Sequence, residues 1–296
     1  MKRDIIRWMY DGLRVLPKIK CVKLSFVFTI ALSTICNDHQ EIDLIICVPT
    51  RGDNFEGRKT IRETWGSYAN ESSFTSILIF FIGIPDVSSP TASLTQKLIL
   101  EESVMYGDVL QEDFVDCYNN LSIKSVSILK YVSHYCPKAK YILKADDDMY
   151  INIPFLVNSL KRFQITKPNL KAFVMGSKQT KAHPMRSTDS KWYPEYPEDT
   201  YPDYVIGAAY VASAQASWLL YQASLRLPLF LWEDVYITGM CSKKAGVEVV
   251  DSALFSYLRH TVSGCSFRKR ISGHPYNATE LRVVHRELYD EKLICK

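Results

Sequence analysis

Three adjacent carboxylates, Asp146, Asp147 and Asp148, end an apolar stretch that begins at Tyr141. Like charges packed this closely repel each other, and a divalent cation would relieve the repulsion. If the stretch is a strand, Asp146 and Asp148 face one way and Asp147 the other. Carboxylate oxygens suit Mg²⁺ or Mn²⁺ better than Zn²⁺, and such a cation can bind the oxygens of a diphosphate. A solvated acidic turn after a strand is the simpler interpretation.

A second acidic pair, Glu233 and Asp234, follows the apolar residues 228–232. A carboxylate with such neighbours is partly desolvated, which raises its pKa toward the range that suits a general base. Asp234 also precedes a predicted helix over residues 235–241 and is suited to cap it. The two roles are compatible.

Two arginines, Arg58 and Arg62, lie one turn apart on a helix predicted over residues 58–65. Guanidinium groups near the carboxyl end of a strand can bind a phosphate group or a nucleotide. Two solvated surface arginines are the alternative.

The elements that must position these side chains are strands and helices in alternation. Continuous apolar runs at residues 44–48 and 77–82 predict strands that are covered on both faces. Helices are predicted over residues 95–106, 116–136 and 214–224. This alternation favours an open α/β sheet, in which ligands bind beyond the carboxyl ends of the strands. The three aspartates lie at one such end.

Several functions have no support in the sequence. The chain has no GxGxxG fingerprint, Walker loop, HExxH motif or nucleophile elbow. Its 36 basic and 32 acidic residues give a net charge of +4, and seven of the basic residues lie within the first 23 positions. Because the excess is confined to that end, we do not expect nucleic acid to bind the body of the protein.

The basic N-terminal segment runs into the uncharged residues 24–36. With residues 21–23 they predict a short membrane anchor or a cleaved signal peptide, and a buried N-terminal helix is the alternative. Basic residues before the run would stay cytoplasmic, so the chain after Cys36 would be lumenal. We therefore divide the chain into a cytoplasmic tail (1–20), an anchor (21–36), a short stem (37–42) and a catalytic domain (43–296).

Sequons and cysteines also favour the lumen. Glycosylation sequons begin at Asn70, Asn120 and Asn277. The eight cysteines show no CxxC and no zinc-ligand spacing, so disulfides suit them better than a metal site. The six cysteines after Cys36 allow fifteen pairings, and Cys47, inside an apolar run, is suited to be a buried thiol.

Six segments carry a family resemblance. In order and spacing they resemble the β-1,3-galactosyltransferase family and its β-1,3-N-acetylglucosaminyltransferase relatives over residues 43–296. The segments are RKTIRETWG (58–66), FVDCYNNLSIK (114–124), KADDDMYIN (144–152), KWY (191–193), 201–213 and EDVYITGMC (233–241). The resemblance implies a GT-A fold, with an open mixed sheet and helices on both faces, in a single-pass type II Golgi membrane protein.

The resemblance also implies a reaction. The enzyme would be an inverting, Mn²⁺-dependent hexosyltransferase that moves galactose from UDP-galactose to the 3-hydroxyl of a glycan on a glycoprotein or glycolipid. Transfer of N-acetylglucosamine from UDP-N-acetylglucosamine is the alternative, and a silent nucleotide-sugar-binding homologue is another. A metal-dependent phosphohydrolase is a third possibility, although nothing marks a second metal site.

Site residues follow by position in the family motifs. Asp146 and Asp148 belong to the metal and nucleotide motif with Asp148 as the direct ligand, and Asp234 matches the general base beside Glu233. Val284-His285 resembles a valine–histidine pair that would make His285 a metal ligand, with His260 as its competitor. The donor-side positions are Arg58, Arg62, Asp146, Asp147, Trp192 and Tyr204.

Two residues depart from the family pattern. Val205 stands where relatives have a cysteine, so the disulfide scheme must differ or a partner thiol is left unpaired. Ala209 replaces a glycine where the backbone could approach substrate or need an unusual dihedral angle. These departures bear on donor choice and on the level of activity.

Overall fold

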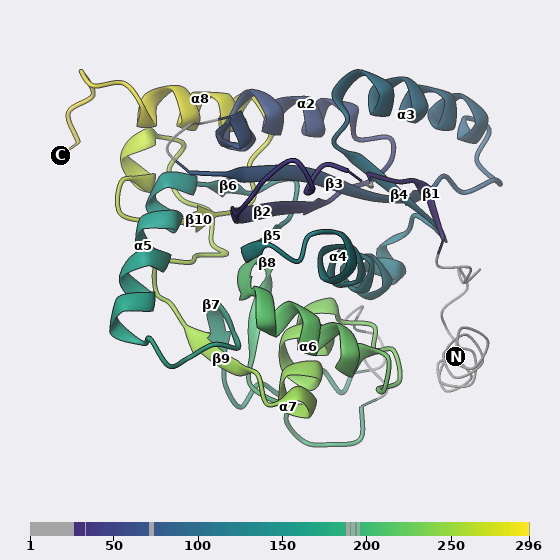
Figure 1. Cartoon of the computed structure of the whole chain (residues 1–296), viewed down its shortest axis with the longest axis vertical. Helices are drawn as coiled ribbons and strands as arrows, with labels where there is room; N and C mark the ends of the chain where they lie inside the picture. Colours follow the sequence, from purple (N-terminus) through teal and green to yellow (C-terminus); the bar gives the residue numbers. More distant parts are fainter. Residues whose placement is uncertain are drawn as a thin grey trace.

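A mixed eight-stranded sheet with helices on both faces organises the chain (Figure 1). The computed structural model describes residues 27–32, 34–70, 74–187, 190, 193 and 196–295. The strand order is β1-β4-β3-β2-β5-β8-β7-β9, and a two-stranded ladder joins β10 to β6. The strands are β1 (Phe28–Ile30), β2 (Ile42–Pro49), β3 (Ser76–Ile84), β4 (Val109–Val115), β5 (Ala139–Ala145), β6 (Tyr150–Ile151), β7 (Phe173–Gln179), β8 (Tyr204–Ser213), β9 (Glu248–Asp251) and β10 (Ser272–Gly273).

The centre of the sheet is parallel, as the continuous apolar runs predict. Strand β2 pairs in parallel with both β3 and β5, whereas β8 runs antiparallel to β5. Alternate residues of β2 enter two cores: Leu44 and Ile46 pack with α2 and α5, and Ile45 and Cys47 pack with α4. Cys47 is therefore a buried thiol, as expected.

Helices α2, α5 and α8 contribute to the core on one face of the sheet, and α4 to that on the other. Helix α6 contributes to a third core, together with β8 and the π-helix η3. The α-helices are α2 (Phe55–Glu63), α3 (Ala92–Tyr106), α4 (Leu121–Tyr135), α5 (Ile153–Thr166), α6 (Ala214–Ser224), α7 (Ser242–Ala245) and α8 (Ala278–Leu288). The short helical turns are η1 (Trp65–Asn70), η2 (Tyr118–Asn120), η3 (Val235–Cys241) and η4 (Gly264–Phe267).

The start of the described chain belongs to the sheet. Strand β1 pairs antiparallel with β4, and the Phe28 ring packs edge-on against Tyr131. Cys36 forms a disulfide with Cys136. The fifteen pairings considered from the sequence did not include this one, because they were limited to the six cysteines after Cys36. Residues 28–36 belong to the segment 21–36, which the sequence predicted to be a membrane anchor, a cleaved signal peptide or a buried helix. In the structure, residues 28–30 form an edge strand instead. An uncharged run does not by itself distinguish these possibilities. Residues 1–26 lie outside the description, and no helix in the described ranges has the length and apolarity to cross a membrane.

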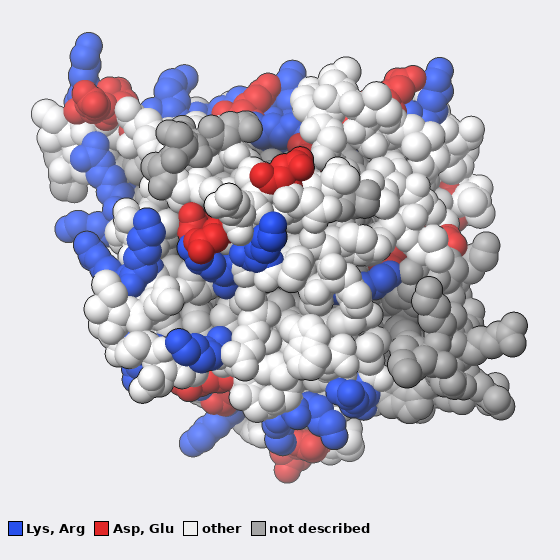
Figure 2. All heavy atoms as spheres, viewed as in Figure 1, with Lys and Arg blue, Asp and Glu red and all other residues white. Residues whose placement is uncertain are grey.

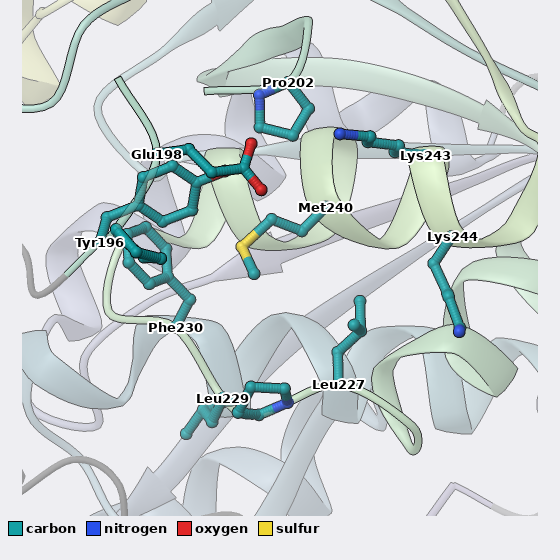
Figure 3. A pocket seen from close by; sticks show the side chains of 11 residues that line it. Tyr196, Glu198, Pro202, Leu227, Leu229, Phe230, Met240, Lys243 and Lys244 are labelled. Atoms are coloured by element: carbon teal, nitrogen blue, oxygen red, sulfur yellow. The ribbon is translucent and has the colours of Figure 1, made fainter. Parts of the chain in front are cut away.

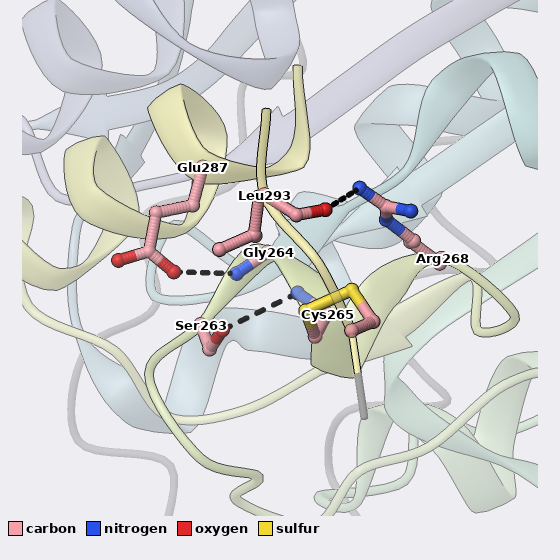
Figure 4. The surroundings of a disulfide bond; sticks show 7 residues. Ser263, Gly264, Cys265, Arg268, Glu287 and Leu293 are labelled. Atoms are coloured by element: carbon pink, nitrogen blue, oxygen red, sulfur yellow. Dashed lines mark hydrogen bonds between the residues drawn. A yellow bond between two sulfur atoms is a disulfide. The ribbon is translucent and has the colours of Figure 1, made fainter. Parts of the chain in front are cut away.

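The C-terminal tail is held by a second disulfide, Cys265–Cys295 (Figure 4). Beside it, Arg268 donates a hydrogen bond of 2.8 Å to the Leu293 carbonyl, and the Gly264 amide donates one of 3.0 Å to Glu287 on α8. A Cβ at Gly264 would lie 2.2 Å from the Leu288 nitrogen, so only glycine fits there.

The surface facing the reader in Figure 2 carries lysine, arginine and acidic side chains interspersed with one another.

Of the predicted glycosylation sites, Asn120 is fully buried and donates a hydrogen bond from its side-chain amide to the Val115 carbonyl. A glycan could therefore not be attached there without unfolding. Asn277 is exposed and caps α8, whereas the Asn70 side chain lies outside the described part.

Candidate functional site

A cleft of about 1030 Å³ opens beyond the carboxyl ends of β2 and β5. Its walls include the loop after β2, the three aspartates, Tyr118 and His274. An adjoining hollow of about 170 Å³ shares Asp146 and Tyr118 with the cleft and adds Glu233 and Asp234. Two acidic groups that are far apart in the sequence therefore line adjoining hollows, where an open α/β sheet places ligands.

The three aspartates occupy a turn rather than the end of the strand. Strand β5 ends at Ala145, and the Met149 amide donates to the Asp146 carbonyl at 3.3 Å. Asp147 accepts hydrogen bonds from Thr50 Oγ1 at 2.5 Å and Asn54 Nδ2 at 2.7 Å. The expectation of strand alternation was wrong because the chain turns at Asp146. Asp147 nevertheless has partners different from those of its neighbours and fixes the loop after β2.

Asp148 and His274 form the pair best suited to a cation. Asp148 Oδ2 lies 3.1 Å from His274 Nε2, and this contact raises the pKa of His274. Asp148 Oδ1 is buried and has no hydrogen-bond partner among the described residues. An unpartnered carboxylate oxygen beside an imidazole fits a divalent cation such as Mn²⁺.

The protein supplies few ligands for such a cation. In the described ranges, no group of three or more histidine, cysteine, aspartate or glutamate side chains is arranged to hold a metal ion.

His285, the expected metal ligand, does not line the cleft. It lies on α8, where its Nδ1 is 3.0 Å from the Tyr150 hydroxyl and its ring packs against Tyr289. Its competitor His260 lies 2.8 Å from the Ser256 hydroxyl. The prediction of His285 was wrong because pairing of β10 with β6 carries His274 to the aspartates instead. No signal in the sequence marks this pairing of two-residue strands.

Arg58 and Arg62 are also placed away from the cleft. Arg58 is fully buried, forms a 2.6 Å ion pair with Glu102 and donates to the carbonyls of Arg51 and Gly52. Arg62 pairs with Glu102 and Asp108. The expectation of phosphate binding was wrong because acidic residues on and after α3 occupy both guanidinium groups. Arg58 instead supports the backbone of the loop that lines the cleft.

Replacing Glu102 with alanine is expected to lower the free energy of unfolding by about 3–5 kcal/mol, because it leaves a buried guanidinium without its countercharge. Urea denaturation measures the change. Glu41→Ala, which removes an exposed partner of Lys140, is the matched control and should cost less than about 1 kcal/mol. Equal effects of the two substitutions would contradict the structural role of Glu102.

A buried lysine connects the two acidic groups. Lys144 Nζ lies 2.6 Å from Asp146 Oδ1 and 3.6 Å from Glu233 Oε2, and it donates to the Gly207 carbonyl at 2.5 Å. Burial raises the pKa of Asp146 to about 6, and Lys144 opposes this rise. Because Lys144 compensates the charge of Asp146, Asp148 is the more available ligand for a cation.

Asp234 caps η3, as one of the two interpretations of the sequence predicted, whereas its role as a general base stays a prediction. Its Oδ1 accepts from its own helix, at the Val235 amide 2.8 Å away, and its Oδ2 accepts from the Gly207 amide at 3.3 Å. Burial raises its pKa. Glu233 is more enclosed, at 8% exposure, and its Oε1 accepts a 2.9 Å hydrogen bond from the Tyr210 hydroxyl. Asp234 therefore faces the cleft more openly than Glu233 does.

Gly207 is required by this close packing. A Cβ at this position would lie 2.9 Å from Glu233 Oε2 and 3.1 Å from Asp234 Cβ. Gly207→Ala is expected to lower kcat at least about tenfold, since small displacements of reacting groups are costly. Steady-state kinetics with circular dichroism as a folding check measure this effect. Ala208→Ser, at the next position, is the control, and equal kinetics for both variants would contradict the prediction.

Two further residues, Tyr204 and Trp192, were predicted to bind the donor. Tyr204 begins β8, and burial raises its pKa to about 12. Trp192 lies outside the described residues. Three further residues, Lys144, Tyr118 and His274, line the two hollows without having been predicted from the sequence, although the first two fall within segments that carried the resemblance.

The two departures from the family pattern are accommodated in the fold. Val205 is buried, exchanges hydrogen bonds with Thr238 and packs in the same core as Cys241, which is outside both disulfides. Ala209 pairs with Ala145 in the sheet, and Lys181 is the one non-glycine residue with positive φ in the described part. Ala209 therefore needs no conformation that is reserved for glycine.

A separate hollow of about 600 Å³ has a different character (Figure 3). Met240 projects into it between Leu227, Leu229 and Phe230, while Lys243 and Lys244 lie at its margin. Its mainly apolar lining does not suit a diphosphate, so the cleft with the aspartates remains the candidate site.

The family profile and the similar sequences agree on one family. The family profile described as Galactosyltransferase matches residues 56–253. Beta-1,3-galactosyltransferase 1 of Mus musculus is 30% identical over 252 residues, which cover 84% of this chain and 74% of the relative. Beta-1,3-galactosyltransferase 2 of Homo sapiens is 33% identical over 244 residues, which cover 80% of this chain and 56% of the relative.

Solved structures give weaker matches. A glycosyltransferase involved in the glycosylation of the major capsid of PBCV-1 aligns with a TM-score of 0.41 and 12% identity, over 81% of this chain and 97% of that one. Mouse xyloside xylosyltransferase 1 aligns with a TM-score of 0.36 and 13% identity, over 79% and 97% respectively.

Proposed function

The chain belongs to the galactosyltransferase family, and from this premise we propose that it transfers galactose from UDP-galactose to the 3-hydroxyl of an acceptor glycan, with inversion at the anomeric carbon. The observation that carries the proposal is the pair of adjoining hollows that share Asp146, one lined by Asp148 and the other by Asp234. A donor diphosphate and an acceptor hydroxyl need these two kinds of group close together. We include the GT-A fold in this proposal, on the basis of the family resemblance.

Asp234 is the group proposed to take the proton. In its ionised form it would accept the proton of the acceptor 3-hydroxyl as that oxygen bonds to C1 of the sugar. The bond from C1 to the diphosphate oxygen breaks, and UDP leaves with the electron pair. The Gly207 and Val235 amides orient the Asp234 carboxylate through their hydrogen bonds.

Asp148 and His274 would hold the cation, which we propose to be Mn²⁺. When bound, it would supply positive charge to the departing diphosphate. Asp147 keeps the loop after β2 in place, and Lys144 keeps Asp146 and Glu233 at their positions.

A lumenal location is the accompanying proposal. Two disulfides, Cys36–Cys136 and Cys265–Cys295, support an oxidising compartment. Placement in the Golgi as a single-pass type II membrane protein follows from the family resemblance.

A donor screen tests the proposed reaction. Purified protein would be incubated with UDP-galactose or UDP-N-acetylglucosamine and a panel of glycans ending in different sugars, with Mn²⁺ or with a chelator. UDP release and the linkage of the product would be measured. We expect β-1,3-linked galactose with Mn²⁺ and no turnover with chelator. Preference for UDP-N-acetylglucosamine would replace the donor assignment, and release of UDP from neither donor would favour the silent homologue.

A further inference from the structure

The cleft beyond β2 and β5 is rich in negative charge. Among the described residues, the carboxylates that line it are Asp53, Asp116, Asp146, Asp147 and Asp148. The basic side chains of its described lining are Arg51 and Lys124, besides His274. A diphosphate that enters the cleft brings further negative charge close to these carboxylates. Its binding is therefore favoured by a basic side chain that is free to approach it.

Lys124 is not free to do so. Its side chain is 3% exposed, and its Nζ donates hydrogen bonds to Asp116 Oδ1 at 2.8 Å and to the Thr50 carbonyl at 2.7 Å. If Lys124 turned toward a ligand, it would leave the Asp116 carboxylate, which is 8% exposed, without its countercharge. Lys124 therefore stabilises the wall of the cleft.

Arg51 is free to approach a ligand. Its side chain is 76% exposed, and its guanidinium donates two hydrogen bonds, of 2.6 and 3.0 Å, to Asp53 in the same loop. Asp53 is itself 52% exposed, and an exposed pair of this kind contributes little to stability. Arg51 can therefore exchange Asp53 for another anion without disturbing the fold.

The backbone that carries Arg51 is held in place from two sides. Arg58 donates hydrogen bonds to the Arg51 carbonyl at 2.7 Å and to the Gly52 carbonyl at 3.0 Å. On the other side, the Thr50 hydroxyl donates a hydrogen bond to Asp147, next to the proposed cation site. Because the loop is already ordered, the cost of binding a ligand through Arg51 is confined to its side chain.

We propose that Arg51 binds the diphosphate of the nucleotide-sugar donor and releases Asp53 when it does so. This inference rests on the proposed function, to which it adds a donor-binding residue. A guanidinium presents parallel N–H groups that match two phosphate oxygens. Arg51 thus takes the role first expected of Arg58 and Arg62, whose guanidinium groups are occupied by acidic residues on and after α3.

Calorimetric titration of UDP into the full-length protein, with Mn²⁺ present, tests the proposal. Arg51→Gln should weaken UDP binding by about 10- to 100-fold, the range for lost hydrogen bonds to a charged group. The affinity for uridine, which has no phosphate, should not change. Lys59→Gln is the matched control, because it removes an exposed positive charge from α2 outside the cleft, and it should leave both affinities unchanged. Arg51 and Lys59 are both exposed, so folding should be retained.

Steady-state kinetics give a second measurement. Arg51→Gln should raise KM for the donor at least about tenfold and leave KM for the acceptor unchanged. A rise in the acceptor KM alone would mean that Arg51 binds an anionic group of the acceptor, and equal losses for uridine and UDP would place the contact on the nucleoside. Either result would overturn the proposal. Unchanged UDP affinity in Arg51→Gln would overturn it too and leave the proposed function intact, whereas an unaltered chain that binds no UDP would refute both.

Discussion

Replacing Asp234 with asparagine is expected to lower kcat for sugar transfer by about 10²- to 10⁴-fold, because the variant cannot accept the acceptor proton. The amide is close in shape to the carboxylate and can keep one carbonyl oxygen on the Val235 amide. Affinity for UDP should stay near that of the unaltered protein, since Asp234 lines the adjoining hollow and not the cleft that Asp148 lines. Steady-state kinetics with UDP-binding calorimetry would separate these two effects.

Glu233→Gln tests whether the neighbouring carboxylate, and not Asp234, acts as the base. Glu233 is enclosed and bonded to Tyr210, so its replacement should disturb Lys144 and lower stability without removing the proposed base. Normal transfer by Asp234→Asn combined with loss in Glu233→Gln would move the assignment to Glu233.

The pH profile offers a further check on Asp234. A base acts only when ionised, and burial raises the pKa of Asp234 above its ordinary value. Activity should therefore be full above the raised pKa and should fall as the pH drops through it. In a profile of kcat/KM, the acid limb should lie above the pH of about 3.9 that is typical of an exposed aspartate. A limb at or below that value would contradict this assignment.

Replacing Asp148 with alanine is expected to abolish measurable transfer and to make UDP affinity independent of Mn²⁺. The substitution removes the buried, unpartnered Oδ1 and the oxygen that faces His274. Loss of a principal ligand should eliminate the contribution of the cation to both binding and reaction. Calorimetric titration of UDP with Mn²⁺ and with chelator measures the first effect without relying on turnover.

A comparison of two histidines tests the corrected ligand assignment. His274→Ala should lower the affinity for Mn²⁺ by about 10- to 100-fold, measured as the Mn²⁺ concentration that gives half-maximal transfer. His285→Gln should leave the affinity for Mn²⁺ unchanged, because His285 contacts Tyr150 and Tyr289 and does not line the cleft. The reverse result would restore His285 to the metal site.

The sequence was sufficient to predict the architecture around the site. Uninterrupted apolar runs such as residues 44–48 can be buried on both sides, as only central parallel strands are, and β2 has parallel neighbours on each side. Local periodicity likewise placed α6 at Ala214–Ser224 and α4 within residues 116–136. Since parallel strands end at the same edge of a sheet, the position of the aspartates after a strand was enough to locate the cleft.

Tertiary structure alone decided which charged side chains meet. Arg58 and Arg62 were correctly placed on a helix, but their use depends on Glu102, forty or more residues away, which competes with any phosphate for the same donors. His274 reaches Asp148 through a ladder of two-residue strands, whose pairing energy is too small and too nonlocal to leave a pattern in the sequence. Hydrophobic periodicity reports on burial of each element separately, whereas side-chain partners are selected only when distant elements pack together.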